Sequence, residues 1–258
     1  MAQVKLTATV ASQEKLAENI YSMWIDAEPV AAQAKAGQFV SVYSGDGSRL
    51  LPRPISLCET DKEKGRIRLV YRVAGAGTEE FSRYQAGDPI SILGPLGNGF
   101  PLEGMTGKRA FLIGGGIGIP PMLQLAKELD CEKQAVLGYR DGELFLKHQF
   151  EPYTSVDVAT EDGSQGTKGN VMDAVRENGL KADVIFACGP TPMLRAVKAY
   201  ALEQGILCYL SLEERMACGI GACLACVCQS KEVDPHSNVH NKRICKDGPV
   251  FRAEEVEL

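Results

Sequence analysis

Cysteine is spread very unevenly along this chain of 258 residues. Nine cysteines are present, and five of them fall within residues 212–258, where the stretch 229–242 contains little apolar sequence. A segment of fewer than about 50 residues with so little core needs a staple, such as a metal site, to hold one shape. We therefore expect this segment to fold around cysteine-ligated metal. The scattered Cys58, Cys131 and Cys208 are expected to be small buried apolar side chains.

Four of the clustered cysteines have an informative spacing. Cys218, Cys223 and Cys226 form a C-x4-C-x2-C pattern, with Cys245 further along the chain. This is the spacing of plant-type [2Fe–2S] ferredoxins, and the glycines between the first two ligands would let the loop wrap closely around a cluster. Cys228 is the weaker candidate for the fourth ligand, because a single residue separates it from Cys226 in what we expect to be extended chain. The sequence predicts a [2Fe–2S] cluster whose ligands are Cys218, Cys223, Cys226 and Cys245.

Zinc is the competing interpretation of the same segment. Cys223 and Cys226, followed by His236 and His240, mimic a zinc site of two cysteines and two histidines. The two pairs are closer together than is usual for such sites, and Cys218 and Cys245 would be left unused. We expect both histidines to be solvated loop residues. A zinc-stabilised binding module without a redox role stays open as the distant alternative.

Residues 1–103 predict an N-terminal antiparallel β-barrel. Short runs of strand-forming residues are separated by glycine-containing turn signals, a rhythm typical of small barrels. Examples of the predicted strands are Val4–Val10, Ile20–Ile25, Gln38–Val42, Arg66–Arg72 and Pro89–Leu93. The stretch Gly94–Phe100 is expected to break regular structure and connect two domains.

Residues 108–211 predict an α/β domain with a doubly wound parallel sheet, because short apolar runs alternate with helix-like segments. The predicted strands are Ala110–Ile113, Gln134–Leu137, Ser155–Ala159, Asp183–Ala187 and Leu207–Ser211. The predicted helices are Pro121–Leu129, Glu143–Phe150, Asn170–Asn178 and Pro192–Glu203. The chain then divides into units 1–103, 108–211 and 212–258.

Two loops of the α/β unit are candidates for binding a nucleotide. Each lies where a predicted strand ends and a helix begins, so backbone N–H groups and the helix dipole would meet a pyrophosphate. The candidate residues are Gly114, Gly115, Gly116, Gly118, Pro120, Cys188, Gly189 and Pro190. Pro121 stands where the standard fingerprint has its third glycine, so a turn that merely packs is the alternative. Arg140 and Asp141 after the second strand leave the choice between NAD and NADP open.

The barrel carries two further candidates. Arg53–Ser56 pairs an arginine, which offers a planar fork to phosphate, with a serine hydroxyl. Gly75–Thr78 precedes a short helical segment, expected at Glu79–Tyr84, whose start would suit an anion. Alone, each is equally well explained as a surface arginine or a helix cap.

Together these motifs resemble the ferredoxin–NADP reductase superfamily. With the cysteine motif and Cys245–Phe251 added, the whole chain resembles the electron-transfer subunits of type B, NAD-dependent, dihydroorotate dehydrogenase. The resemblance implies an FAD site formed by Arg53, Pro54, Ile55, Ser56, Val70, Tyr71, Arg72, Gly77 and Thr78. It implies the same four cluster ligands, and it makes the two loops described above the NAD site.

The same resemblance implies a function. Electrons would pass from a partner subunit that carries FMN and oxidises dihydroorotate to orotate, a step of pyrimidine synthesis, through [2Fe–2S] and FAD to NAD⁺. The complex would be a heterotetramer with two copies of each subunit, and no catalytic residue for the carbon chemistry is expected on this chain. A sulfide-dehydrogenase or hydrogenase-linked NAD(P)H reductase subunit is the nearer alternative.

Composition excludes several other classes of partner. A net charge of −5 and a pI near 5.4 argue against nucleic acid, which binds to a basic face. No run approaches the roughly 18 uncharged apolar residues of a membrane span. The first residues lack the apolar stretch of a signal peptide. We expect a cytoplasmic protein with no nucleic-acid or membrane partner.

Overall fold

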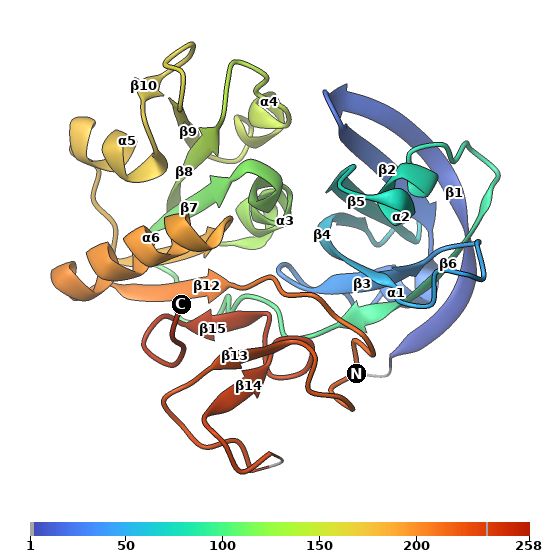
Figure 1. Cartoon of the computed structure of the whole chain (residues 1–258). Helices are drawn as coiled ribbons and strands as arrows, with labels where there is room; N and C mark the ends of the chain where they lie inside the picture. Colours follow the sequence, from blue (N-terminus) through green and yellow to red (C-terminus); the bar gives the residue numbers. More distant parts are fainter. Residues whose placement is uncertain (1–2, 236) are drawn as a thin grey trace.

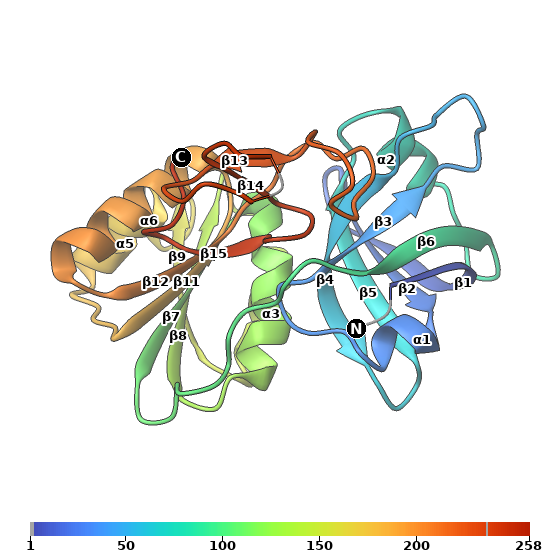
Figure 2. The ribbon, with the colours of Figure 1, turned by 90° about the horizontal axis from the view of Figure 1, so that it is seen from below.

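The computed structural model describes residues 3–235 and 237–258. A β-barrel and an α/β body lie side by side, and the last part of the chain lies along one edge of both (Figure 1). Seen from below, helix α3 (Ile119–Glu128) stands between the barrel and the parallel sheet (Figure 2). This arrangement confirms the predicted fold class.

Six antiparallel strands close the barrel in the order β1-β2-β5-β4-β3-β6. Their bounds are β1 Val4–Ala17, β2 Ile20–Asp26, β3 Phe39–Tyr43, β4 Arg53–Asp61, β5 Arg66–Arg72 and β6 Pro89–Leu96. Two short helices, α1 Glu28–Ala31 and α2 Ala76–Phe81, cover its ends. Alternate residues along the strands, such as Val40 and Val42, fill an apolar interior.

Three details of the barrel differ from the sequence predictions. Strand β4 was not among the example strands named from the sequence, and it includes Pro54 near its start, a residue that is unfavourable inside a strand. The prediction that regular structure ends at Gly94 was wrong, because β6 continues to Leu96. Helix α2 begins at Ala76 and not at Glu79, since the Thr78 hydroxyl closes the turn before it.

The α/β body has a sheet of seven strands in the order β10-β9-β8-β7-β11-β12-β15, parallel except for the last. Its strands are β7 Arg109–Gly115, β8 Glu132–Tyr139, β9 Ser155–Thr160, β10 Thr167–Lys168, β11 Val184–Cys188, β12 Leu207–Ser211 and β15 Val250–Arg252. Besides α3, its helices are η1 Gly116–Gly118, α4 Lys147–Phe150, α5 Val171–Glu177 and α6 Thr191–Gln204.

The two faces of this sheet carry separate cores, as a doubly wound sheet requires. Phe111 and Ile113 of β7 pack with α5 and α6, whereas the intervening Leu112 packs with α3. The helix predicted at Glu143–Phe150 is only the single turn α4, so its predicted length was wrong. Leu146 is buried with a left-handed φ of 65°, which ends any helix before it.

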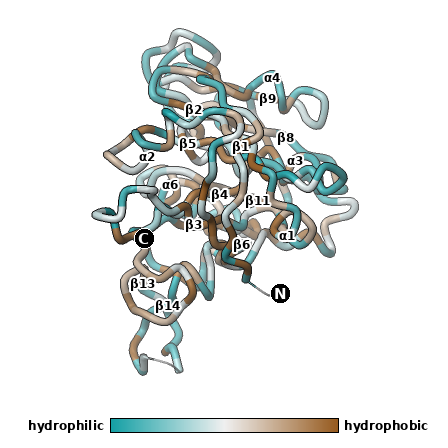
Figure 3. The backbone as a smooth tube through the Cα atoms, turned by 90° about the vertical axis from the view of Figure 1, so that its right-hand side faces the viewer, coloured by the Kyte–Doolittle hydropathy of each residue, from teal (hydrophilic) through white to brown (hydrophobic). Residues whose placement is uncertain are grey.

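Residues from 212 onward do not form an isolated body. Strand β15 pairs antiparallel with β12, and Phe251 and Val256 join the core under α6. A separate ribbon of β13 (Val227–Gln229) and β14 (Asn241–Arg243) projects away from the rest of the molecule (Figure 3). No helix in the described part of the chain has the length and apolar content needed to cross a membrane.

Candidate functional site

Arg53 lies directly on the first turn of α2. A Cβ atom on Gly77 would stand 2.4 Å from the Nε atom of Arg53, so only glycine lets the guanidinium rest there. The Thr78 hydroxyl accepts a hydrogen bond from the Ala74 backbone nitrogen at 2.9 Å and donates to the Gly75 carbonyl at 3.0 Å. The fold therefore brings Arg53 onto the turn that contains Gly77 and Thr78, although this turn lies far from Arg53 in the sequence.

The charge of Arg53 has no carboxylate partner in the described residues. The nearby Arg49 differs, because its guanidinium pairs with Glu80 at 2.6 Å and donates to the Ala76 carbonyl at 3.0 Å. Arg53 donates to the Leu51 carbonyl only. An arginine held in place beside a glycine-lined turn, with its charge uncompensated, fits the phosphates of FAD.

The other predicted flavin residues divide between the two faces of their strands. Ile55 is part of the barrel core, whereas Pro54 and Ser56 are half-buried on the opposite face of β4. Alternation along the strand leaves only the latter two side chains free to face a bound group.

On β5, the side chains of Val70 and Tyr71 are buried. The Tyr71 hydroxyl donates to Gln13 at 2.9 Å, its ring stacks on Tyr21 with centroids 6.2 Å apart, and burial raises its pKa. Tyr71 and Val70 can therefore offer a flavin their backbone only. Arg72 is exposed, and its Nη2 atom would lie 3.4 Å from a Cβ on Gly116, so it reaches from the barrel to the glycine turn.

The two candidate nucleotide loops touch each other. Strands β7 and β11 are parallel neighbours, with Cys188 opposite Gly114 in the register. A Cβ on Gly118 would lie 2.3 Å from the Cys188 carbonyl oxygen, and one on Gly115 would lie 2.5 Å from the Met193 sulfur. The expectation that both loops share one edge of the sheet is confirmed, and packing alone explains why these positions are glycine.

Fewer of these loop residues are open to a ligand than the sequence suggested. Gly114, Gly115, Gly118 and Pro120 are buried. Gly116 is half-buried with a φ of 53°, Gly189 is half-buried, and Pro190 is exposed at the start of α6. Burial raises the pKa of the Cys188 thiol to about 12, so this side chain is a neutral group in the loop.

The four predicted cluster ligands gather as two pairs. The Sγ atoms of Cys218 and Cys223 are 3.3 Å apart, and the thiols of Cys226 and Cys245 share a hydrogen bond. When four cysteines hold a [2Fe–2S] cluster, each iron takes two of them, so two pairs of thiols are the arrangement that such a cluster needs. The chemistry of this donor set therefore fits the cluster.

Backbone N–H groups around the pairs favour thiolates, the form that binds metal. Burial opposes ionisation of Cys218, but the N–H groups of Ile220 and Cys223, at 3.5 and 3.4 Å from its sulfur, outweigh it and lower its pKa to about 7. The hydrogen bond with Cys245 lowers the pKa of Cys226 to about 6 and raises that of Cys245. The Gly221 N–H points at the Cys245 sulfur from 3.1 Å.

Arg243, which was not predicted as a site residue, holds this loop in shape. It is buried, and its guanidinium donates to the Gly221 carbonyl at 3.0 Å and pairs with Asp247 at 3.3 Å and Asp234 at 3.6 Å. A charged side chain two residues from a ligand was the only available signal in the sequence.

Cys228 lies apart from the paired thiols. Its sulfur donates to the Lys242 carbonyl at 3.6 Å across the β13–β14 ribbon, and burial raises its pKa to about 11. These contacts favour Cys245 as the fourth ligand.

The zinc interpretation finds little support in the described residues. His240 is exposed, and its Nδ1 lies 2.9 Å from the Lys231 carbonyl oxygen. His236 lies outside the described residues. Within 3–235 and 237–258, no three His, Cys, Asp or Glu side chains are grouped in a way that would hold a single metal ion.

The cysteine loop reaches over to the barrel (Figure 2). A Cβ on Gly219 would lie 2.8 Å from the Ser41 hydroxyl, which is fully buried and has no hydrogen-bond partner among the described residues. Ser41 pairs with Pro54 of the predicted flavin strand. A buried hydroxyl without a partner is expected where a bound group supplies the missing hydrogen bond, and the Ser41 hydroxyl lies between the cysteine loop and that strand. Sequence alone gave no signal for it, because its place depends on strand pairing.

Comparison with known proteins identifies the family. The chain is 45% identical over 256 residues to the dihydroorotate dehydrogenase B (NAD⁺) electron transfer subunit of Bacillus caldolyticus, covering 97% of each chain. It is also 45% identical to the same subunit of Listeria monocytogenes, covering 96% of this chain and 97% of that one. The chain belongs to the family of dihydroorotate dehydrogenase B electron transfer subunits. Residues 213–257 match the family model of the iron–sulfur cluster binding domain of dihydroorotate dehydrogenase B.

Solved structures agree with this membership. An NADH-dependent reduced ferredoxin–NADP oxidoreductase matches with a TM-score of 0.87 and 31% identity, over 98% of this chain and 90% of that one. The ferredoxin reductase of carbazole 1,9a-dioxygenase has the same fold, with a TM-score of 0.69 and 21% identity, over 80% and 67% of the two chains.

These findings confirm the predicted resemblance and the role as the electron-transfer subunit of an NAD-dependent dihydroorotate dehydrogenase, with an iron–sulfur cluster, FAD and NAD as its redox groups. The family name also implies a catalytic partner subunit. The particular ligand residues, the FMN of the partner and the stoichiometry remain predictions.

Proposed function

We propose that this chain passes electrons from an FMN-containing dihydroorotate dehydrogenase subunit to NAD⁺, in a complex with two copies of each subunit. Units 1–103, 108–211 and 212–258 are proposed to bind FAD, NAD and the [2Fe–2S] cluster. The observation that carries the proposal is the position of the paired thiols, in a loop whose Gly219 rests on the strand beside the flavin tetrapeptide.

A [2Fe–2S] cluster exchanges single electrons and a nicotinamide exchanges a hydride, so a flavin between them supplies the conversion. The chain's own residues hold these groups close together. The proposed cluster ligands are Cys218, Cys223, Cys226 and Cys245. Arg243 holds the loop between the first two of them by a hydrogen bond to the Gly221 carbonyl.

On the barrel, Arg53 is proposed to neutralise phosphate charge, with Gly77 and Thr78 shaping the turn beneath it. The side chains of Pro54, Ser56 and Arg72 and the backbone of Ile55, Val70 and Tyr71 complete the proposed flavin site. Arg72 extends toward Gly116, where the proposed flavin and nicotinamide sites meet.

The nucleotide is proposed to lie against the two touching loops. The exposed surfaces of Gly116, Gly189 and Pro190 would contact it, while Gly114, Gly115, Gly118, Pro120 and Cys188 hold the loops in position.

The cysteine loop is proposed to face the partner. Ile220 and Leu224 lie within it and are 43% and 47% exposed, so this one loop presents two large apolar side chains to solvent. Burial of these residues against the catalytic subunit would exclude water from the cluster. The carbon chemistry of dihydroorotate belongs to that subunit, since the proposed sites contain no general base.

Reconstitution tests the proposal. The isolated chain, loaded with cluster and FAD, should reduce an artificial dye with NADH but should not oxidise dihydroorotate. Adding an FMN-containing dihydroorotate dehydrogenase subunit should create dihydroorotate:NAD⁺ activity. The Cys223→Ser complex should keep dye reduction if FAD is retained, and lose the coupling. Full coupling without a cluster would contradict the electron path. Failure with every such partner would favour a sulfide- or hydrogenase-linked role.

A further inference from the structure

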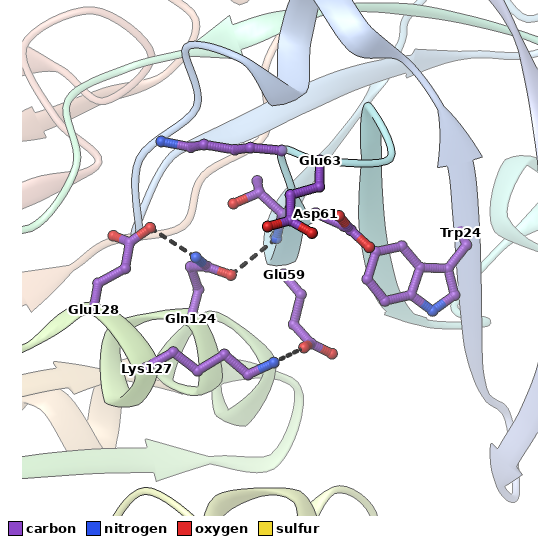
Figure 4. A pocket seen from close by; sticks show the side chains of 9 residues that line it. Trp24, Glu59, Asp61, Glu63, Gln124, Lys127 and Glu128 are labelled. Carbon is purple, nitrogen blue, oxygen red and sulfur yellow. Dashed lines mark hydrogen bonds and ion pairs between the residues drawn. The ribbon is translucent and has the colours of Figure 1, made fainter.

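The barrel and the α/β body are joined by a buried group of charges. Glu59 of β4 is 7% exposed and lies between Arg68 of β5, whose Nη1 is 2.5 Å from its carboxylate, and Lys127 of α3. Figure 4 shows Lys127 reaching from α3 to Glu59 across the gap between the two bodies. One carboxylate therefore pairs with a cation from its own barrel and with a cation from the neighbouring body.

Two amide side chains extend this junction. Gln124 of α3 accepts a hydrogen bond from the Thr60 backbone nitrogen at 2.9 Å (Figure 4). Gln149 of α4 accepts one from Arg68 at 2.6 Å. Hydrogen bonds are directional, and these come from two different helices of the α/β body. They therefore fix how that body is rotated on the barrel as well as how far it lies from the barrel.

Both elements of the junction also lead to the proposed redox sites. Strand β4 begins at Arg53 and reaches Glu59 after about 20 Å of extended chain. Helix α3 begins at Ile119, directly after the glycine turn, and reaches Lys127 after about 12 Å. A rotation at the junction would therefore shift the proposed flavin and nicotinamide sites relative to each other.

We explain the burial of these charges by the fixed orientation that they give the two bodies, and not by a gain in the free energy of unfolding. Taking an ion pair out of water costs about as much as its attraction returns, so an apolar contact of the same size would hold the bodies together at least as well. Apolar surfaces can slide, however, whereas the Glu59 carboxylate has to meet two fixed cations.

We propose that Glu59, Arg68 and Lys127 form an interdomain clamp that sets the orientation of the nucleotide-binding body on the barrel. Lys127 is then a positioning residue for hydride transfer between NADH and FAD. This inference rests on the proposed function for its kinetic consequence, but its structural part concerns the chain's own residues.

Lys127→Met is the variant that tests the clamp, because its side chain is 31% exposed and can lose its charge without leaving a fully buried cavity. Removing Glu59 or Arg68 would instead leave the other charge buried without its partner, which is strongly destabilising. Lys127→Arg restores the charge. Lys147→Met is the matched control, since Lys147 pairs with Glu151 inside the α/β body at 2.6 Å and forms no ion pair or hydrogen bond with a barrel residue among the described residues.

Two measurements are made on the chain carrying cluster and FAD. In stopped flow, Lys127→Met should reduce the rate of FAD reduction by NADH about tenfold, the scale expected when reacting groups are misaligned by a fraction of an ångström. FAD content and the cluster spectrum should stay at wild-type levels. Lys127→Arg should recover most of the rate. In hydrogen exchange, the Thr60 amide, which donates to Gln124 across the junction, should exchange faster in Lys127→Met than in the wild type or in Lys147→Met.

The outcomes distinguish the clamp from the proposed function. Wild-type chain that binds FAD but is never reduced by NADH would overturn the proposed function, and hydrogen exchange at Thr60 would still decide the clamp. Lys127→Met that matches Lys147→Met in both the rate of FAD reduction and the exchange rate of the Thr60 amide would overturn the clamp. A loss of rate that Lys127→Arg does not recover would show that the charge is not what positions the nucleotide.

Discussion

Two glycine-rich segments of this chain use their missing side chains differently. In the nucleotide turn, the space next to Gly115 and Gly118 is filled by protein atoms, the Met193 sulfur and the Cys188 carbonyl. In the cysteine loop, Gly219 and Gly221 have φ values of 70° and 80°, and the chain turns its N–H groups toward sulfur. Close packing alone requires glycine at Gly115 and Gly118, whereas Gly219 and Gly221 combine close packing with a left-handed backbone, although both segments look like flexible loops in the sequence.

The largest effect should follow from removing a ligand of the second segment. Cys245→Ser should abolish the [2Fe–2S] spectrum, because one iron would lose one of its two thiolates. Cys228→Ser is the control and should keep the cluster, since its sulfur bonds the Lys242 carbonyl. Iron and acid-labile sulfide analysis after anaerobic purification measures both. The reverse pattern, or zinc in place of iron, would contradict the assignment.

The next effect should come from the first segment. Gly118→Ala would place a methyl group 2.3 Å from the Cys188 carbonyl oxygen, which is backbone and cannot move aside. We expect a loss of about 3 kcal/mol of unfolding free energy, the upper range for overpacking. Gly179→Ala is a control for a glycine that a Cβ would not crowd, although its φ of 60° carries a smaller strain. Equal losses in urea unfolding would show that packing at Gly118 is not special.

Gly77 is an intermediate case, in which a charged side chain fills the space. Arg53→Ala should weaken FAD binding by about 2 kcal/mol, roughly 30-fold in Kd, the usual contribution of a hydrogen bond to a charged group. Arg49→Ala should have a much smaller effect, because Arg49 is already paired with Glu80. Fluorescence titration of the FAD-free chain compares them. Stoichiometric FAD in both variants would place the flavin elsewhere.

The smallest effect concerns the contact between the cysteine loop and the barrel. Ser41→Ala removes a buried hydroxyl without a partner among the described residues, so the chain without cofactors should gain up to about 1 kcal/mol of stability. In the loaded chain the hydroxyl is expected to donate toward the cluster, so its loss should move the cluster's midpoint potential to a more negative value. Thermal unfolding and an EPR-monitored redox titration check the two parts. An unchanged potential would limit Ser41 to packing.

The sequence predicted much of the fold because periodicity is a local property. Alternation in β1 and β2, and the change of rhythm near Lys108, were sufficient for the barrel and the parallel sheet. Strand β4 has no clear strand pattern at its start, because Pro54 is unfavourable by itself, and pairing with β3 and β5 compensates for it. The helix predicted from Glu143 is confined to Lys147–Phe150, because Leu146 has a left-handed backbone. The composition of the segment does not reveal this conformation.

The candidate site was predictable only where spacing carries the information. The four cysteines could be selected from nine by their separation along the chain. Which side chain of β5 faces inward depends on strand register, so Tyr71 was expected at the flavin while its ring lies in the barrel core. Ser41 meets the cysteine loop through strand pairing and long-range packing, which no local pattern marks, and the only sequence signal for Arg243 is its place two residues from Cys245.

The pairing of β15 with β12 has a consequence for how the protein is made. The ribosome completes β12 at Ser211 and then must add the whole cysteine loop, Cys245 and finally Val250–Arg252 before the sheet receives its last strand. Until then β12 offers an open edge, which invites mispairing with other chains. The same stretch of synthesis supplies the fourth cysteine and closes the edge. Closure of this sheet edge and completion of the predicted set of cluster ligands therefore come within a few residues of each other during synthesis.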